Sequence, residues 1–278
     1  MNDKDFSDAW LVVLGHGTEQ NENSAAPVYQ HAEELRRRQI FAGVREAFWK
    51  QEPQIKTVLS EIMAPRVFVA PLFISEGYFA GEVIPRELGF SGHSTLNLQH
   101  STIFYCSPVG THASMTDVIL SRANDIVAQF PFPRAPRPPD ITLLIAGHGT
   151  EENENSRQAV ERQVGLIRAL NLYAGVQAVY LEESPRIADC YALAHTKNLV
   201  IVPFFISDGL HTQEDIPVLL GEAKPVVRQR LDAGRPPWRN PTEKNGKRVW
   251  YAPAIGSEPH LADVILERVR EAACSGGP

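Results

Sequence analysis

The segment Leu143-Leu144-Ile145-Ala146-Gly147-His148-Gly149-Thr150-Glu151 places an apolar run directly before a histidine that stands between two glycines. An uninterrupted apolar run bounded by glycine is typical of a strand that is buried on both faces of a parallel sheet. Glycine also permits a tight turn in which the backbone approaches a ligand closely. We therefore expect His148 at the carboxyl end of a strand, where open α/β sheets bind ligands. A histidine in an ordinary polar turn is the alternative interpretation.

The same pattern occurs earlier in the chain, as Leu11-Val12-Val13-Leu14-Gly15-His16-Gly17-Thr18-Glu19. A shift of 132 positions, the separation of His16 and His148, also pairs residues 71–77 with 203–209 and residues 82–85 with 214–217. A larger shift then pairs Asp117 with Asp263, so the second copy carries an insertion within about residues 219–247. Only two long units are present, which indicates a duplicated domain rather than a solenoid.

Each copy alternates strand-like and helix-like segments, and this alternation predicts an α/β fold with parallel four-stranded sheets. Strands are expected at residues 10–14, 44–49, 66–72 and 102–107, and again at 142–146, 176–181, 199–205 and 249–252. The proline-rich segment 130–139 cannot continue a helix or a central strand. We therefore expect two domains, residues 1–135 and 136–278. The insertion contains the segment 235–241, which is predicted to be a surface loop; covering a flat ligand is the alternative.

The composition excludes several classes of function. The chain has 278 residues, 43% of them hydrophobic and 22% charged, as in globular domains. A formal charge of −6 provides no electrostatic footprint for nucleic acid. The three cysteines show no paired spacing, which argues against disulfides and against a cysteine-based metal site. The polar amino terminus and the lack of any run as long as a membrane span favour a cytoplasmic protein with no membrane partner.

Three side chains of the second copy follow the expected ends of strands. They are His148, Glu182 or its neighbour Glu183, and His211. Two imidazoles and a carboxylate suit a divalent transition-metal ion such as Co²⁺, Fe²⁺, Ni²⁺ or Zn²⁺. An open coordination position would make such a site catalytic. Taken separately, each residue is also compatible with an ordinary loop.

The first copy lacks part of this set. The shift pairs His211 with Phe79 and Glu182 with Lys50, so that only His16 and Glu82 remain as possible ligands there. A phenyl ring and an ammonium group do not bind a cation in these positions. The first site is therefore predicted to be degenerate, with Tyr78, Phe79 and Lys50 forming a wall of a shared ligand cleft. Simple core packing is the alternative for Tyr78 and Phe79.

Together these motifs resemble the class II chelatases of tetrapyrrole synthesis, in particular the CbiX-type sirohydrochlorin cobaltochelatases and sirohydrochlorin ferrochelatases. The resemblance depends on residues 147–150, on the strand end 179–182, and on the block Val202-Pro203-Phe204-Phe205-Ile206-Ser207-Asp208-Gly209-Leu210-His211-Thr212-Gln213-Glu214-Asp215-Ile216-Pro217. It covers nearly the whole chain as two fused units. It implies two flavodoxin-like αβα domains with the tetrapyrrole in the cleft between them.

The resemblance also implies an activity and a set of ligands. His148, His211 and Glu182 fall on the metal-binding and catalytic positions of the family. The implied reaction is insertion of Co²⁺ or Fe²⁺ into sirohydrochlorin or a related tetrapyrrole, in cobalamin or siroheme biosynthesis. The metal is then a substrate, Co²⁺ first with Fe²⁺ or Ni²⁺ as alternatives, and no organic cofactor is expected. The expected partner is the tetrapyrrole, and the chain is expected to act as a monomer or a homodimer.

Metal insertion exchanges two pyrrole N–H protons for one divalent ion. Neutral imidazole is both a metal ligand and a proton acceptor, which suits His148 and His211 to this task. Further candidates are Glu82, Glu214 and Asp215 for proton exit, and Arg86, Arg157 and Arg186 for the carboxylates of the substrate. Two rival functions remain. A histidine phosphatase is disfavoured because glycine precedes each histidine where arginine is needed, and a non-catalytic metal- or tetrapyrrole-binding protein is the alternative.

Overall fold

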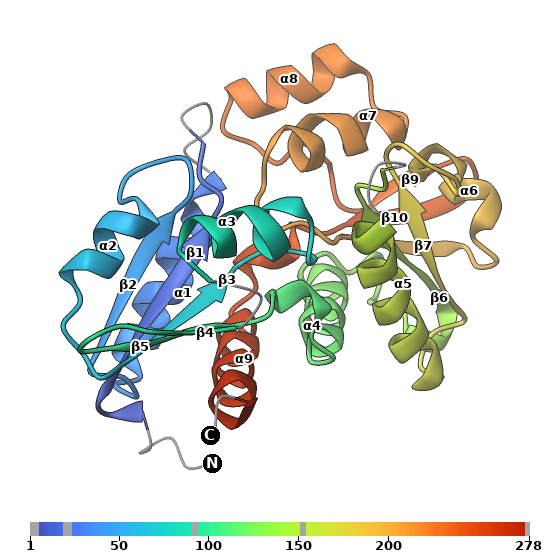
Figure 1. The fold of residues 1–278 in the computed structure, drawn as a ribbon. Coiled ribbons are helices and arrows are strands. Elements are labelled where there is room, and N and C mark those ends of the chain that lie inside the picture. Colours follow the sequence, from blue (N-terminus) through green and yellow to red (C-terminus); the bar gives the residue numbers. More distant parts are fainter. Residues whose placement is uncertain (1–5, 19–23, 91–93, 151–153, 276–278) are drawn as a thin grey trace. The chain divides into compact units, whose positions relative to one another are not determined.

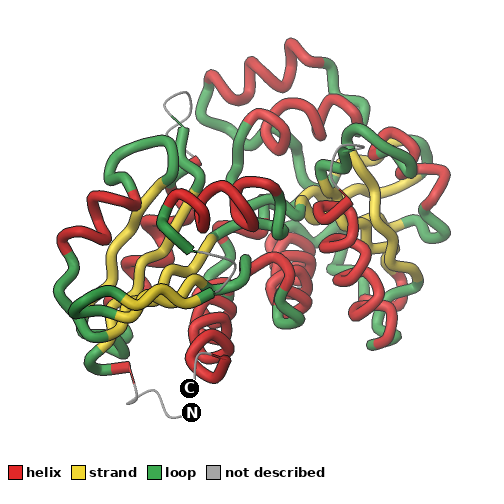
Figure 2. Tube along the Cα trace, viewed as in Figure 1, coloured by secondary structure: helices red, strands yellow, loops and turns green. Residues whose placement is uncertain are grey.

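The computed structural model describes residues 6–18, 24–90, 94–150 and 154–275. The chain forms two compact units, one of Met1–Met115 with Pro259–Pro278 and the other of Thr116–Glu258. Each unit contains one five-stranded sheet, labelled in Figure 1, and Figure 2 shows the strands of each sheet flanked by helices. The α/β class expected from the alternating pattern is confirmed.

The first unit follows the predicted order of strands and helices. Its sheet has the order β2-β1-β3-β5-β4, in which β1, β2, β3 and β5 are parallel. The strands are β1 (Ala9–Gly15), β2 (Gly43–Phe48), β3 (Arg66–Pro71), β4 (Thr95–Asn97) and β5 (Thr102–Tyr105). The helices between them are α1 (Ala26–Arg37), α2 (Ile55–Glu61), the π-helical turn η3 (Phe79–Val83) and α3 (Ile84–Glu87).

The second unit repeats this topology as β7-β6-β8-β10-β9. Its strands are β6 (Ile141–Gly147), β7 (Gly175–Tyr180), β8 (Asn198–Pro203), β9 (Thr242–Lys244) and β10 (Lys247–Tyr251). Its helices include α5 (Glu154–Ala169), α6 (Cys190–Leu193), the π-helical turn η7 (His211–Asp215), α7 (Ile216–Leu219) and α8 (Lys224–Asp232). The registers of the two sheets correspond, with Gly15 opposite Phe48 in the first and Gly147 opposite Tyr180 in the second.

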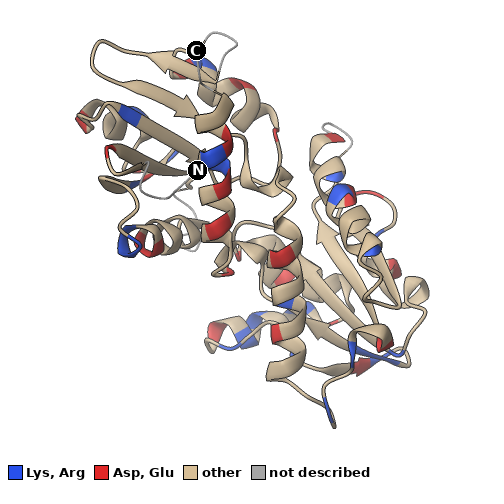
Figure 3. Ribbon diagram, turned by 90° about the horizontal axis from the view of Figure 1, so that it is seen from below, with Lys and Arg blue, Asp and Glu red and all other residues tan. Residues whose placement is uncertain are grey.

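The central strands are buried because their sequences are apolar on both faces. Every residue of β6 is buried, as are six of the seven in β1. Neither strand carries a charged residue, nor does β8, and Figure 3 shows the charged residues mainly on helices. Removing such strands from water is the main favourable term in folding, at roughly 25 cal/mol for each Å² of apolar surface. The buried core therefore fixes the positions of the carboxyl ends of these strands.

Each sheet has a fifth strand that the sequence pattern did not predict. Strands β4 and β9 are each three residues long and pair antiparallel with β5 and β10. Such short segments have too few residues to show the alternation of apolar and polar side chains that identifies an edge strand. The expectation of two purely parallel four-stranded sheets was therefore incomplete.

The last helix of each sequence copy belongs to the unit of the other copy. Helix α4 (Met115–Gln129) lies almost entirely in the second unit, where Thr116 donates a hydrogen bond to Gln163 of α5 at 2.9 Å. Helix α9 (Leu261–Ser275) lies in the first unit, where Arg268 donates to the carbonyl of Pro108 at 3.1 Å. The compact units thus differ from the linear division at residue 135 that was expected from the proline-rich segment. A repeat marks the copied sequence, whereas packing decides which sheet a helix covers.

The insertion of the second copy is structured. It adds α8 and a segment that is hydrogen-bonded to the end of β10, where the Asn240 side chain bonds to both the amide and the carbonyl of Tyr251. Trp238 is only 2% exposed and packs against the Tyr251 ring at 6.4 Å between centroids. The expected surface loop is therefore anchored by a buried tryptophan at its centre. Over the described part of the chain, no helix has both the length and the apolar character needed to cross a membrane.

A close backbone approach holds the loop after β8. Gly256 donates its N–H to the carbonyl of Phe205 at 3.1 Å, and a Cβ atom at Gly256 would lie 1.5 Å from the carbonyl oxygen of Ile206. Gly110 makes the equivalent contacts with Phe73 and Ile74 in the first unit. Only glycine allows these two segments to pack this closely.

The substitution Gly256→Ala is expected to destabilise the protein by about 3 kcal/mol or more, because the added methyl group overlaps a backbone oxygen. The control is Gly165→Ala in α5, where a Cβ meets nothing within 4 Å. That change should stabilise the helix by about 0.5–1 kcal/mol. Urea unfolding followed by circular dichroism measures both, and equal stability of the two variants would contradict the role given to Gly256.

Candidate functional site

His148 lies directly after β6, at the carboxyl edge of the second sheet. The chain turns there through Gly149, which has a φ of +64°. A side chain at Gly149 would also collide with Tyr180 and Glu183, since its Cβ would come within 2.8 Å of both. The Gly-His-Gly turn is therefore packed against the end of β7.

His211 begins the π-helical turn η7 that follows β8. Turns of this kind are rare and recur at functional sites. The turn is held by the buried hydroxyl of Tyr251, which donates a hydrogen bond to the carbonyl of Thr212 at 2.7 Å. Burial raises the pKa of Tyr251 well above its usual value, so its hydroxyl stays protonated and remains a donor. Tyr251 was not among the residues expected from the sequence.

The structure brings the two predicted histidines together. The rings of His148 and His211 lie 4.9 Å apart between centroids and meet edge to face at 84°. Nδ1 of His148 lies 3.1 Å from the carbonyl oxygen of Gly149, and Nδ1 of His211 lies 2.8 Å from a carboxylate oxygen of Asp215. Both partners are acceptors, so each bond requires the proton on Nδ1. The Nε2 atom of each ring is then left with the lone pair that a metal ion needs.

The two glutamates at the end of β7 have different surroundings. A carboxylate oxygen of Glu182 lies 3.8 Å from Nδ1 of His148, and the Glu182 side chain is 57% exposed. Glu183 is instead mostly buried and accepts a hydrogen bond from Arg157 at 2.9 Å. The guanidinium of Arg157 also lies over the ring of Tyr180. Glu183 is thus held by Arg157 and packs against the Gly-His-Gly turn. Glu182 lies beside the imidazole pair, and its exposed side chain has room to rotate.

The three side chains predicted as metal ligands do not form a complete ligand set in the structure. Within the described residues, no three His, Cys, Asp or Glu side chains form a group that could hold a metal ion as they stand. The imidazole pair is assembled, and Glu182 lies on the Nδ1 side of His148 rather than beside Nε2. Rotation of the exposed Glu182 side chain is needed to complete the set of three that the sequence predicted.

The first unit keeps the same scaffold with different side chains. Nδ1 of His16 bonds to the carbonyl of Gly17 at 2.8 Å, and the ring of Phe79 meets His16 at 5.2 Å and 79°. Phe79 therefore occupies the place that His211 has in the second unit. The ammonium of Lys50 lies 5.5 Å from the centre of the Phe79 ring. Tyr78 is 56% exposed, so core packing does not account for its position.

Other residues considered from the sequence have structural partners. Glu214 pairs with Arg228 at 2.9 Å and with Lys224 at 2.6 Å, and these hydrogen bonds lower its pKa to about 2. It is a buried anchor for α8 and stays ionised, which does not suit a role in proton exit. Arg157 is paired with Glu183, as described above. The remaining candidates, Glu82, Arg86 and Arg186, have exposed side chains.

Comparison with known proteins identifies the family. The model of the CbiX family matches residues 10–126 and again residues 142–272. A Halobacterium salinarum protein named probable sirohydrochlorin cobaltochelatase is 41% identical over 283 aligned positions, covering 96% of this chain and 92% of its own. The Methanopyrus kandleri sirohydrochlorin cobaltochelatase is 25% identical and matches 48% of this chain with 96% of its own length. The chain therefore belongs to the CbiX family.

Solved structures show the same fold. A multi-domain protein of Deinococcus radiodurans with structural similarity to chelatases superposes with a TM-score of 0.77 at 28% identity. The match covers 96% of this chain but only 55% of that protein. SirB from Bacillus subtilis, solved with Fe³⁺, superposes with a TM-score of 0.69 at 20% identity over 96% of this chain and 97% of its own. The relationship predicted from the sequence motifs is confirmed.

Asp215→Asn is expected to lower the affinity for Co²⁺ by about 10–100-fold, because the amide holds Nδ1–H of His211 less firmly and makes the ring a weaker ligand. Titration with Co²⁺, followed by its visible absorption, measures the change. Asp117→Asn, at an exposed position of α4, is the matched control and should leave the affinity unchanged. Equal affinities of the two variants would contradict the positioning role of Asp215.

Glu214→Gln is expected to lower the melting temperature at neutral pH, because it removes both ion pairs of α8 with η7. The pKa of Glu214 is depressed in the folded protein, from 4.5 to about 2. Its stabilisation is therefore complete above pH 4.5 and is lost as the pH falls toward 2. Melting curves should converge for variant and wild type in that range. Glu243→Gln, which removes an exposed pair with Arg248, should change little at any pH.

Proposed function

We propose that this protein is a lyase that inserts a divalent metal ion, Co²⁺ first, into sirohydrochlorin. The observation that carries the proposal is the contact of His148 with His211 at the ends of β6 and β8, with both Nδ1 atoms engaged. Membership of the CbiX family and the 41% identity to a probable sirohydrochlorin cobaltochelatase support the reaction and the substrate. Fe²⁺ and Ni²⁺ are the alternative metals, since two imidazoles and a carboxylate also bind them.

The first step in this proposal is capture of the metal. Nε2 of His148 and Nε2 of His211 supply two ligands, and Glu182 rotates to supply the third. The carboxylate adds a negative charge beside the cation, which strengthens binding at a partly exposed site. Asp215 and the carbonyl of Gly149 hold the two rings in the tautomer that binds metal.

The second step is the exchange itself. The divalent ion leaves the imidazoles for the pyrrole nitrogens, and two N–H protons leave the macrocycle. Each imidazole that loses the metal regains a free lone pair, so His148 and His211 become proton acceptors at the moment when protons are released. Glu182 provides a further acceptor, and its exposure to water provides a route for protons to leave.

A non-catalytic protein that only carries metal or tetrapyrrole is the second candidate. The substitutions in the first unit favour it, because Phe79 and Lys50 replace two of the three proposed ligands there. The two candidates differ in how many sirohydrochlorin molecules each protein molecule converts. An enzyme converts the absorption spectrum of sirohydrochlorin to that of its cobalt complex many times per protein molecule, whereas a carrier changes it once at most.

His148→Ala and His211→Ala are each expected to reduce the rate of Co²⁺ insertion at least about 100-fold, because one ligand and one proton acceptor are lost together. Glu182→Gln should reduce the rate, and Glu183→Gln should instead lower the melting temperature by releasing Arg157. His195→Ala, at an exposed position away from the pair, is the control. The assay is the absorption change of sirohydrochlorin under multiple turnover. Activity of His148→Ala equal to that of the control would refute the proposed site.

A further inference from the structure

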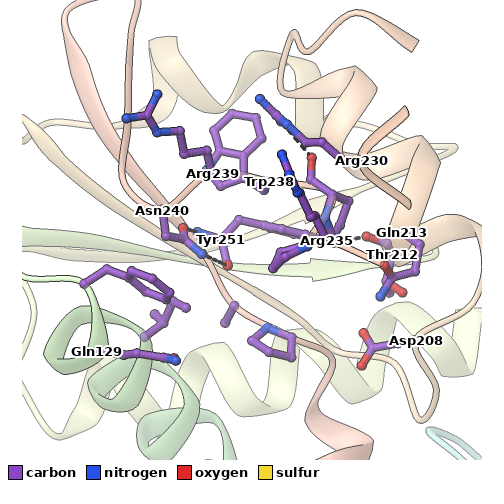
Figure 4. Close-up of a pocket in the computed structure, with 16 residues that line it drawn as sticks. Gln129, Asp208, Thr212, Gln213, Arg230, Arg235, Trp238, Arg239, Asn240 and Tyr251 are labelled. Carbon is purple, nitrogen blue, oxygen red and sulfur yellow. Dashed lines mark hydrogen bonds between the residues drawn. The ribbon is translucent and has the colours of Figure 1, made fainter. Parts of the chain in front are cut away.

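The second unit contains a cavity of about 650 Å³ beside the turn that carries His211. Its walls include Thr212 and Gln213 from η7, Tyr251 from the end of β10, and Trp238 and Asn240 from the insertion. Figure 4 shows Asp208, Thr212 and Gln213 on one side of this space and Trp238, Asn240 and Arg239 on the other. We call this space the insertion cavity. Its volume is typical of a pocket for a small organic molecule or for part of a larger one.

The first unit has a smaller counterpart. A cavity of about 410 Å³ there is lined by Glu76, Ala80, Gly81 and Tyr105, which correspond to Asp208, Thr212, Gln213 and Tyr251. The duplicated fold thus places a hollow behind each π-helical turn. In the second unit, the insertion enlarges the hollow and adds a new wall with Arg230, Arg235 and Arg239. The change occurs beside η7, the turn that carries His211.

The charges of this wall suit an anion. Arg230 is already paired with Glu222 at 3.0 Å. The guanidinium groups of Arg235 and Arg239 are exposed, and neither has an ion pair or hydrogen bond with any residue in the described part of the chain. Asp208, the acid on the opposite side, accepts a hydrogen bond from the amide of Ala254 at 3.0 Å. Two unpaired guanidinium groups above an apolar floor therefore favour a carboxylate attached to an apolar body.

The location of the cavity links it to the metal site. Thr212 and Gln213 follow His211 directly in the chain, so one turn has the imidazole at its start and the cavity behind its next two residues. A tetrapyrrole carries acetate and propionate side chains around its rim. The same turn therefore borders both the proposed metal site and the cavity.

We propose that the insertion cavity binds a carboxylate side chain of the tetrapyrrole, with Arg235 and Arg239 as the pairing residues. This assignment rests on the proposed metal insertion into sirohydrochlorin and adds residues that select the substrate. The contact is the same in the ground state and in the transition state, so it contributes to KM rather than to kcat. Neither arginine is among the proposed metal ligands His148, His211 and Glu182.

The test is the double variant Arg235→Gln/Arg239→Gln. Its KM for sirohydrochlorin should rise roughly tenfold, as expected for loss of a hydrogen bond to a charged group, with kcat within about twofold. Its affinity for Co²⁺ should not change. The control is Arg134→Gln/Arg162→Gln, which removes the same charge from exposed positions outside the cavity. Equal KM values for the two double variants would overturn the assignment.

Two further measurements distinguish a failure of the proposed metal insertion from a failure of the cavity assignment. Binding of metal-free sirohydrochlorin, measured by its absorption, tests the arginines even if the wild-type protein inserts no metal. A weaker dissociation constant for the double variant than for the control then supports the cavity, and equal constants overturn it. Isophthalate, a small aromatic dicarboxylate, should compete with sirohydrochlorin on the wild type. Isophthalate binding that needs both arginines but does not compete would assign the cavity to a free organic acid and overturn the tetrapyrrole assignment.

Discussion

The hydrogen bond from the buried hydroxyl of Tyr251 to the carbonyl of Thr212 is the contact on which the site depends. It ties the last parallel strand to the π-helical turn that begins with His211. A single hydrogen bond contributes only about 1 kcal/mol net, but an unsatisfied buried carbonyl costs about 1–3 kcal/mol. Together with the close approach of Gly256 to Ile206, this tether sets where η7 begins and therefore where His211 lies. The contact with His148 follows from that position.

The same tether occurs in the first unit, where the hydroxyl of Tyr105 donates to the carbonyl of Ala80 at 3.0 Å. The scaffold has thus been kept in both copies while the side chains that it presents have diverged. Phe79 meets His16 in nearly the geometry with which His211 meets His148. Comparison of the two copies therefore distinguishes the shared scaffold of the turn from the side chain at its start. The turn and its support are common to both units, and the residue at the start of the turn is Phe79 in the first and His211 in the second.

The exchange of the last helices is another consequence of the duplication. The two sheets are similar, and α4 and α9 each pack with the unit that does not contain the rest of their own sequence copy. The proline-rich segment after α4 leads the chain into β6, and α4 packs with that second unit. Arg268 of α9 donates to the carbonyl of Pro108 and to the hydroxyl of Thr111, and both bonds lie within the first unit. Buried polar contacts of this kind select one of two otherwise similar packings.

The sequence by itself determined the elements and their order, because each strand and helix is set by local apolar periodicity and by the glycines and prolines that end it. It also determined the duplication and the strand ends at which His148, His211 and Glu182 lie. Only the tertiary structure decided which glutamate supports the turn, which sheet each last helix covers, and that Tyr251, Asp215 and Trp238 position the site. Those features depend on contacts between segments that are distant in the chain. Such contacts leave no local pattern, since a tyrosine that holds a turn has the same sequence signature as one that merely fills a core.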